Sequence, residues 1–216
     1  MAATMPRLKM LARRDYSSLP DRDPLHLYYW PIFGKLYRKR VEMCLAECRS
    51  GQRVLEVGFG SGITFVNLSE QYEEIHGIDL TAKCEPTMEL FRQRGIKTFL
   101  RNGNVMQLPY PENYFDTVLL ISILEHLKPA DQEVAFREIR RVLKPGGQVV
   151  YGVPIERPFM VFMFRLLGYN IREHHFSTQE DVAAAARAQL REMSRKRMRS
   201  RLWPGSIYEV GHYVKS

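Results

Sequence analysis

Cysteine is scarce in this sequence, with three residues among 216 and no Cys-x-x-Cys pair. An odd number of cysteines without paired spacing argues against a disulfide framework and against a zinc site made of thiolates. A reducing cytoplasm is therefore the compartment we expect. Cys44 and Cys48 are one helical turn apart, which favours a packing role for both side chains.

Long apolar runs are also lacking. The longest apolar stretch, from Pro158 to Leu167, is interrupted by Arg165 and is about half of what a helix needs to cross a bilayer. No apolar run follows the first basic residues, so we expect no secretory signal. The composition, 45% apolar and 26% charged, is typical of a folded globular chain and excludes a disordered or fibrous one.

Acidic residues are in the minority, with 24 Asp and Glu against 32 Lys and Arg, for a net charge of +8. The excess lies at the two ends. Residues 1–53 carry 11 basic against 5 acidic side chains and residues 187–216 carry 8 against 2, whereas the middle is net acidic. A basic surface favours nucleic acid, an acidic membrane or an anionic substrate. The ends are either docking surfaces of this kind or merely solvated faces.

Short apolar runs alternate with helical patterns through the middle of the chain. This alternation predicts an α/β fold with a mainly parallel, doubly wound sheet. After Pro154 the pattern changes to an apolar segment, and Ser177 with Glu180 then predicts a capping box that begins a helix. The expected strands are 53–57, 74–79, 97–100, 115–121, 148–153 and 207–215, and the expected helices include 63–72, 86–94 and 129–143.

The central motif runs Glu56-Val57-Gly58-Phe59-Gly60-Ser61-Gly62, between an expected strand and an expected helix. Glycine permits positive φ and lets a ligand approach the backbone closely. Asp79 ends the next strand, 21 residues after Gly58, where a carboxylate can accept both hydroxyls of a ribose. Turn and acid together predict a nucleoside-containing cofactor at the carboxyl end of the sheet.

The spacing Gly-x-Gly-x-Gly behind Glu56 differs from the dinucleotide fingerprint. It resembles the first motif of the class I S-adenosylmethionine-dependent methyltransferases, and most closely their small-molecule, quinone and lipid branch. The resemblance implies a seven-stranded sheet whose last strand is antiparallel. It also implies that the turn holds the amino-acid end of S-adenosylmethionine and that Asp79 holds its ribose. Glu56 either contacts the cofactor or only orders the turn. The cofactor residues implied within these two segments are Glu56, Gly58, Phe59, Gly60, Gly62, Asp79 and Leu80.

Later segments resemble further motifs of this family in the same order, so that the resemblance covers roughly residues 35–153. It implies that Asn104 and Val105 contact the adenine, and that Ser122 lines the site. Asn104 replaces the usual aspartate of the family, but its side-chain oxygen can still accept a hydrogen bond. We predict that residues 1–34, which are basic and aromatic and precede the segment covered by the resemblance, form an N-terminal extension or lid. The methyltransferase domain would then span residues 35–216, with an apolar insertion near 154–176.

Three histidines are candidates for the catalytic base. His126 follows the fourth expected strand, with Glu125 beside it. This segment resembles that of quinone-precursor O-methyltransferases, which bind a divalent metal with Glu-x-x-Glu-His, but Ser122 replaces the first ligand here, so we expect no metal. His174 and His175 follow the apolar segment, where the family often borders its acceptor pocket, and either could act as a base or bind a phosphate. Each of the three histidines has a packing or helix-capping role as its alternative.

Residues 25–33 are rich in aromatic and aliphatic side chains and precede a basic cluster, which is typical of a membrane interface or of a lid with ordinary core residues. We therefore expect a methyltransferase for a small amphiphilic or lipid-like acceptor, cytoplasmic and in peripheral contact with an anionic membrane. The alternatives are RNA methylation, for which the sequence has no dedicated motif, and a non-catalytic nucleoside-binding or membrane-docking module. DNA is not an expected partner, and the oligomeric state is left open. The basic cluster comprises Lys35, Arg38, Lys39 and Arg40.

Overall fold

The computed structural model describes residues 5–16, 25–31, 34–155, 176–199 and 205–216. His174, His175 and nearly all of the apolar segment after Pro154 lie outside these ranges, so the predictions made for them stay predictions. Within the described residues, no helix is both long enough and apolar enough to cross a membrane.

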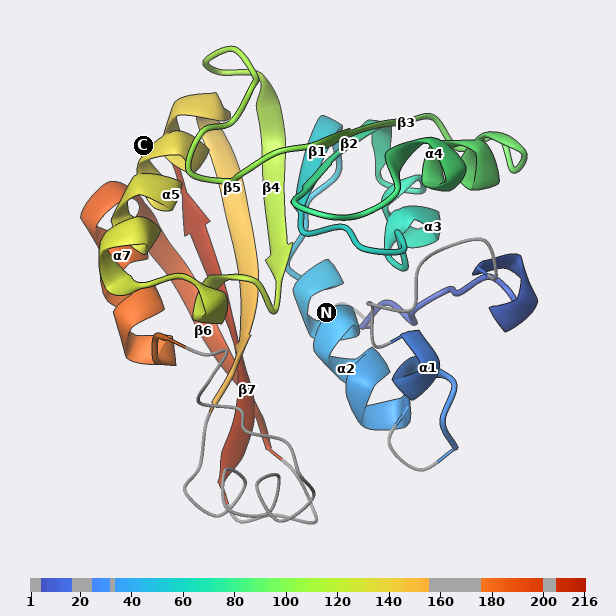
Figure 1. The fold of residues 1–216 in the computed structure, drawn as a ribbon. Helices are drawn as coiled ribbons and strands as arrows, with labels where there is room; N and C mark the ends of the chain where they lie inside the picture. The colour runs from blue at the N-terminus through green and yellow to red at the C-terminus, as the bar shows by residue number, and fades with distance from the viewer. Residues whose placement is uncertain (1–4, 17–24, 32–33, 156–175, 200–204) are drawn as a thin grey trace.

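One seven-stranded sheet forms the centre of the molecule, with the strand order β3-β2-β1-β4-β5-β7-β6 (Figure 1). The first five strands pair in parallel, and β7 is antiparallel to both of its neighbours. The predicted fold class is therefore confirmed. The strands are β1 (Gly51–Val57), β2 (Tyr72–Asp79), β3 (Thr98–Asn102), β4 (Phe115–Ile121), β5 (Leu143–Pro154), β6 (Arg191–Arg199) and β7 (Ser206–Val214).

Helices cover both faces of the sheet. In Figure 1, α2, α3 and α4 lie on one side, and α5 and α7 lie on the other. Both faces of the central strands are covered, and β4 is accordingly apolar from Val118 to Ile121. The helices are η1 (Arg13–Tyr16), α1 (Leu25–Tyr28), α2 (Gly34–Leu45), α3 (Phe65–Leu68), α4 (Cys84–Arg92), η2 (Leu124–His126), α5 (Pro129–Val142) and α7 (Gln179–Gln189).

Two expected helix boundaries were wrong. The helix predicted over residues 63–72 is the short α3, because the chain turns after Leu68 and Tyr72 already begins β2. The predicted capping box is one residue too early. Thr178, not Ser177, is the N-cap of α7, and its hydroxyl and backbone N–H exchange hydrogen bonds with Asp181. Ser177 instead donates its hydroxyl proton to the carbonyl of Leu127.

The N-terminal segment packs on the core. Leu8, Tyr16 and Tyr28 are each less than a tenth exposed and belong to the apolar cluster on the α2 side of the sheet. The side chain of Asn67 donates to the carbonyl of Arg7 and so fixes this segment against α3. Residues before α2 therefore contribute to the core on the side of the sheet where α2 and α3 pack.

An ion pair between β1 and β2 predicts a change of stability in acid. Arg53 donates to Glu74 at 2.9 Å, and this hydrogen bond lowers the pKa of Glu74 from 4.5 to about 2. An acid whose pKa is lower in the folded state stabilises the protein above its unfolded pKa, and this contribution is lost as the pH falls from 4.5 towards 2. We therefore expect Glu74→Gln to lower the free energy of unfolding at neutral pH by at most about 1 kcal/mol, since the pair is partly exposed.

Urea unfolding at neutral pH and near pH 3 measures this effect. The difference in stability between parent and Glu74→Gln should shrink in acid, whereas Glu73→Gln, a change at the exposed neighbour, should have little effect at either pH. A constant difference at both pH values would show that the charge of Glu74 contributes nothing.

Candidate functional site

The carboxyl ends of β1, β2 and β4 surround a cavity of about 270 Å³. These ends meet at one edge of the sheet because the strands run in parallel, and the strand order reverses between β1 and β4. Ligands of doubly wound sheets bind at such a switch point. The residues that line the cavity include Arg40, Glu56, Gly58, Asp79, Ser122 and Ile123.

The glycine turn forms one wall of this cavity. Gly58, Gly60 and Gly62 all have positive φ, between 50° and 72°, which L side chains rarely adopt. A Cβ at Gly58 would lie 2.0 Å from Cδ1 of Ile123, and a Cβ at Gly62 would meet the rings of Phe65 and Phe91. The backbone conformation of the turn therefore requires glycine at these positions, and the absence of side chains leaves its peptide groups open to a ligand.

Asp79 is held beside the turn by backbone hydrogen bonds. Its Oδ2 accepts from the N–H of Gly60 at 3.0 Å, and its Oδ1 accepts from the N–H groups of Thr81 and Ala82. A carboxylate has about four acceptor positions, so that it can still accept from a ligand. The acid expected at the ribose thus lies against the turn, 19 residues away along the chain from Gly60.

Glu56 places a second carboxylate in the cavity. It is 3% exposed, lies at the end of β1 and accepts a hydrogen bond from the hydroxyl of Thr64. This bond links β1 to the residue before α3 and orders the turn between them. Both roles proposed for Glu56 remain open, because a carboxylate that lines the cavity can order the turn and also face a cationic group.

Arg40 is a cavity residue that sequence reasoning did not single out. The cluster of basic residues 35–40 was interpreted as surface, but Arg40 lines the cavity and its Nε is buried without a hydrogen-bond partner. Its guanidinium lies 4.0 Å from the ring centroid of Tyr37 and 5.3 Å from that of Tyr208. Burial acts to lower the pKa of Arg40, but interactions with tyrosines 28, 37 and 208 and with Glu125 raise it overall.

Helical spacing is the signal that could have found Arg40. Val41, Cys44 and Leu45 are buried along α2, so that the face of Cys44 points to the core. Arg40 precedes Cys44 by four residues and therefore shares that face. A cation in such a position must meet a partner or a ligand, because a buried charge without either is costly.

The end of β4 contributes Ser122, whose φ is 57°. Its hydroxyl oxygen lies 3.1 Å from the hydroxyl oxygen of Tyr208, which is fully buried in β7. Burial raises the pKa of Tyr208 well above its usual value, so this side chain is a neutral hydroxyl. Tyr208 of β7, two strands away from β4 in the sheet, thus holds Ser122 in place on the cavity wall.

Most of the remaining predicted site residues lie around the cavity rather than on its wall. Leu80 is 71% exposed, and Val105 is 5% exposed within the core on the α5 side. The side-chain oxygen of Asn104 accepts from the backbone N–H of Met106 and orders its own loop. His126 is an exposed residue of η2. Phe59 does line the cavity, and Gly62 supports the turn from behind.

The charged groups of the cavity fit a nucleoside joined to an amino acid better than they fit a dinucleotide. Two carboxylates, Glu56 and Asp79, would repel a pyrophosphate, so that a dinucleotide is a poor occupant. A ligand with a ribose diol, an ammonium and a carboxylate would match Asp79, Glu56 and Arg40, respectively. S-adenosylmethionine has these three groups, and the glycine turn leaves room for it beside the backbone.

Comparisons with known proteins agree with this geometry. Residues 55–151 match the family model described as a methyltransferase domain. The chain is 26% identical to the probable tRNA methyltransferase 9B of Bos taurus over 84% of this chain and 36% of that protein. It is 30% identical to the ubiquinone/menaquinone biosynthesis C-methyltransferase UbiE of Cupriavidus taiwanensis over 62% of this chain and 59% of the relative. The chain thus spans less than two thirds of either relative.

A solved structure supports the fold. The N-methyltransferase NodS from Bradyrhizobium japonicum, in complex with S-adenosyl-L-homocysteine, superposes with a TM-score of 0.65 over 94% of this chain and 95% of NodS. Its sequence identity of 17% supports the fold alone. The family match covers the strand–turn–strand region that builds the cavity, so residues 55–151 are assigned to the methyltransferase domain family.

Proposed function

We propose that this protein transfers a methyl group from S-adenosylmethionine to a small, amphiphilic acceptor. The observation that carries the proposal is the convergence of the glycine turn and Asp79 on one cavity that also contains Glu56 and Arg40. The glycine turn and Asp79 account for a nucleoside, and Glu56 and Arg40 account for a zwitterionic amino acid. A dinucleotide, the other ligand considered, has no zwitterionic amino-acid group.

The residues of the chain have distinct parts in this proposal. When bound, S-adenosylmethionine supplies an electrophilic methyl group on a sulfonium. Asp79 would accept from the ribose hydroxyls, while Glu56 and Arg40 would fix the ammonium and the carboxylate. Positioning the two reactants in this way can lower the barrier by roughly 7–11 kcal/mol. Ser122 and Ile123, at the end of β4, would face the path of the acceptor.

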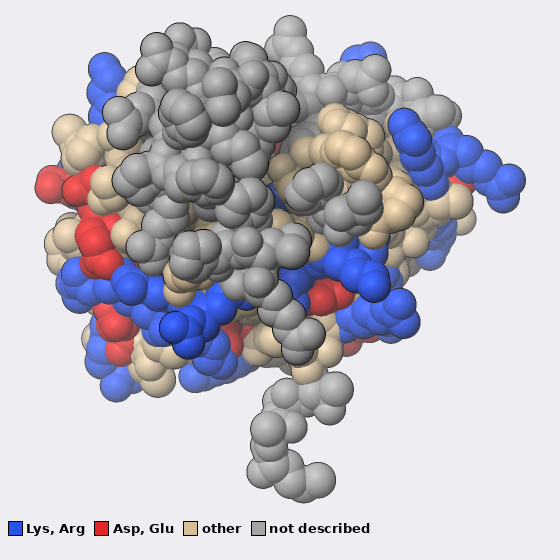
Figure 2. All heavy atoms as spheres, turned by 90° about the horizontal axis from the view of Figure 1, so that it is seen from below, with Lys and Arg blue, Asp and Glu red and all other residues tan. Residues whose placement is uncertain are grey.

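An amphiphilic acceptor is supported by the surroundings of the cavity. Tyr28 of α1 lines it, and Trp30, two residues later, is 47% exposed. Lys35 and its basic neighbours in α2 begin shortly after. Figure 2 shows this end of the molecule, where Lys and Arg are spread across the face with fewer acidic groups between them. Peripheral contact with an anionic membrane belongs to the same proposal, as does a cytoplasmic location.

RNA is the second candidate acceptor. It is favoured by the relative described as a probable tRNA methyltransferase, which matches 84% of this chain, and by the net charge of +8. The quinone enzyme UbiE favours the first candidate to a similar degree. The two acceptors differ in size and charge, so that one assay can separate them.

A screen with methyl-labelled S-adenosylmethionine tests the proposal. Label should pass into a lipid extract or a small-molecule extract in the presence of the protein, and the Asp79→Asn variant should show a much smaller transfer. Transfer into RNA alone would replace the first acceptor class by the second. Cofactor binding without transfer to any of the three would favour the non-catalytic module.

His126 is proposed as a base in this reaction. General-base assistance is worth about 10²–10⁴-fold in rate, so we expect His126→Ala to slow turnover by a factor in that range. Cofactor affinity should not change, because His126 does not line the cavity. A pH–rate profile of both proteins separates the roles: loss of the limb at acidic pH supports a base, whereas an unchanged profile with full activity leaves a packing residue.

A further inference from the structure

The sheet carries a second surface of unusual composition, on the face opposite Glu56. Residues 103–114, which connect β3 to β4, include no helix or strand, and in Figure 1 this connection crosses the sheet as an extended loop, whereas α4 packs behind β3. The face formed by Phe99 and His76, which are register partners on β3 and β2, is therefore not covered by a helix. We call the surface around them the β3 platform: Arg53, His76, Lys97, Phe99 and Arg101.

An aromatic ring forms the centre of the β3 platform. Phe99 is 37% exposed and stacks on His76, with ring centroids 4.8 Å apart and planes inclined by 20°. His76 is itself 5% exposed and is held by the edges of Tyr110, Tyr114 and Phe115. Phe99 is thus backed by a fixed ring on one side, and part of its side chain reaches solvent.

Cations surround this ring. Lys97, the residue before β3, and Arg101 within β3 each lie two positions from Phe99, which places them on the same face of the extended chain. The Nζ of Lys97 lies 4.9 Å from the centroid of Phe99, and Cζ of Arg101 lies 4.8 Å from that of Tyr110. Arg53 lies over Tyr114 at 4.4 Å. Three aromatic rings therefore each have a cation above them.

The charge of the β3 platform is only partly balanced. Glu74 lies 2.9 Å from Arg53 and 3.3 Å from Lys97. Among the described residues, Arg101 has no ion-pair partner within 4 Å. Burial lowers the pKa of His76, so that this ring is neutral at pH 7 and adds no charge. The side chain of Lys97 is 61% exposed, and an anion that contacts it would compete with its ion pair to Glu74.

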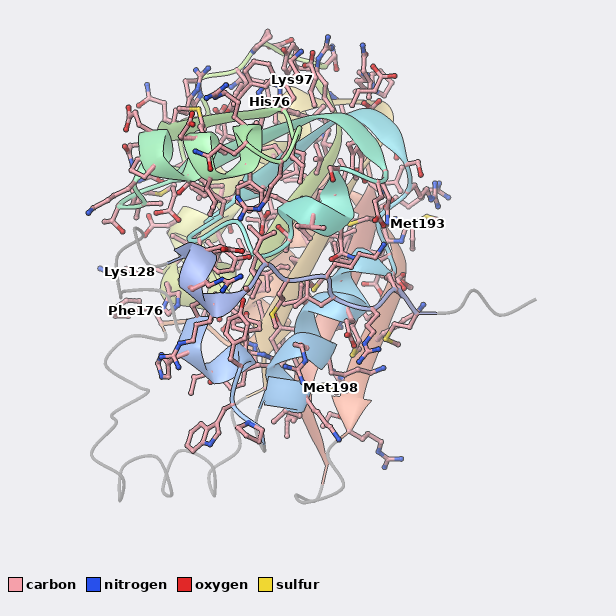
Figure 3. The ribbon with its side chains drawn as sticks, turned by 90° about the vertical axis from the view of Figure 1, so that its right-hand side faces the viewer. His76, Lys97, Lys128, Phe176, Met193 and Met198 are labelled. Atoms are coloured by element: carbon pink, nitrogen blue, oxygen red, sulfur yellow. The ribbon has the colours of Figure 1, made fainter. Side chains whose placement is uncertain are left out.

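We propose that the β3 platform binds single-stranded nucleic acid, with a base stacked on Phe99 and phosphates contacted by Lys97 and Arg101. Aromatic faces with interleaved cations recognise unpaired strands, because every base has a flat face and every link has a negative charge. A membrane is a poorer fit, since Phe99 lies flat on His76 and is a single exposed ring without an apolar neighbour of its kind. Figure 3 shows His76 and Lys97 together at the top of the molecule, far from Phe176 and Lys128 near the cavity end.

Fluorescence anisotropy with labelled oligouridine and oligothymidine tests this proposal on the full chain. Phe99→Leu should weaken binding by about tenfold, whereas Phe99→Tyr, which keeps the ring, should bind as the parent does. Arg101→Gln should lower the slope of log affinity against log salt by about 0.7. Arg92→Gln is the matched control, because Arg92 is an exposed arginine on α4, paired with Glu89.

Three results would overturn the proposal that the β3 platform binds single-stranded nucleic acid. No binding to either probe, or equal binding by Phe99→Leu and Phe99→Tyr, overturns the proposal. Binding to anionic phosphatidylserine vesicles that is lost in Phe99→Leu, without oligonucleotide binding, assigns the surface to a membrane and overturns it also. S-adenosylhomocysteine binding by each variant confirms folding, and it keeps the outcome independent of methyl transfer.

Discussion

Asp79→Asn should weaken the binding of S-adenosylhomocysteine by about 10- to 100-fold, because hydrogen bonds to a charged group contribute about 1.5–3 kcal/mol. The asparagine keeps one oxygen, which can still accept from the N–H groups of Thr81 and Ala82. Its amide nitrogen cannot accept from Gly60 or from a ribose hydroxyl. Isothermal titration calorimetry measures the change directly.

Asp116→Asn is the matched control for this change. Asp116 also accepts from two backbone N–H groups, those of Gln52 and Arg53, but at the opposite end of the sheet. We expect it to reduce stability, because it also loses its ion pair with Lys144, and to leave cofactor affinity unaltered. Equal affinities in parent, Asp79→Asn and Asp116→Asn would exclude the ribose role of Asp79.

Gly58→Ala should abolish most cofactor binding. A left-handed conformation costs a residue with a Cβ about 1–2 kcal/mol, and the φ of Gly58 is 72°. The added methyl group would also displace the side chain of Ile123, since Cδ1 lies 2.0 Å from the Cβ position and both residues line the cavity. We expect the free energy of unfolding to fall moderately and cofactor affinity to fall at least about tenfold.

Gly146→Ala separates the cost of a positive φ from the clash with the side chain of Ile123. Gly146 has a φ of 74°, but a Cβ there would meet nothing within 4 Å, and the residue is remote from the cavity wall. This variant should show the backbone strain alone in a thermal unfolding experiment, with normal affinity for S-adenosylhomocysteine. If Gly146→Ala and Gly58→Ala lost the same stability and both kept their affinity, the glycine turn would have no part in binding.

The central strands and the cofactor turn could be predicted from the sequence because their causes are local. β4 is apolar from Val118 to Ile121, and the spaced glycines require positive φ whatever surrounds them. Asp79 could be placed beside them because parallel strands end at the same edge. The predicted elements differ from the observed ones mainly at their ends, where turns and pairing partners decide the boundary.

β6 could not be predicted because its stability is not local. Five of its nine residues are Lys or Arg, which do not favour a strand in isolation. Arg195 and Arg197 both form ion pairs at 2.7 Å with Glu209, a fully buried carboxylate on β7. Pairing with β7 and this shared acid therefore order the strand. A single sequence does not reveal which acid will face which arginine.

Arg40 was missed for a related reason. Its neighbours Lys35, Arg38 and Lys39 form a charge run, and a charge run predicts a solvated surface. Helical spacing places Arg40 on the face of Cys44, but it equally places Lys39 four residues before the buried Met43, so spacing alone does not separate Arg40 from its neighbours. The catalytic assignment of His126 stays a prediction, because His126 is not among the described residues that line the cavity.

A crystal structure of the protein grown with S-adenosylhomocysteine is the most direct test of the account. We predict density for this molecule in the cavity at the ends of β1 and β2. Its ribose hydroxyls should lie within hydrogen-bond distance of Asp79, and its carboxylate should lie beside Arg40. Density for the molecule at any other place, with the cavity filled by side chains, would contradict the assignment of the cofactor site.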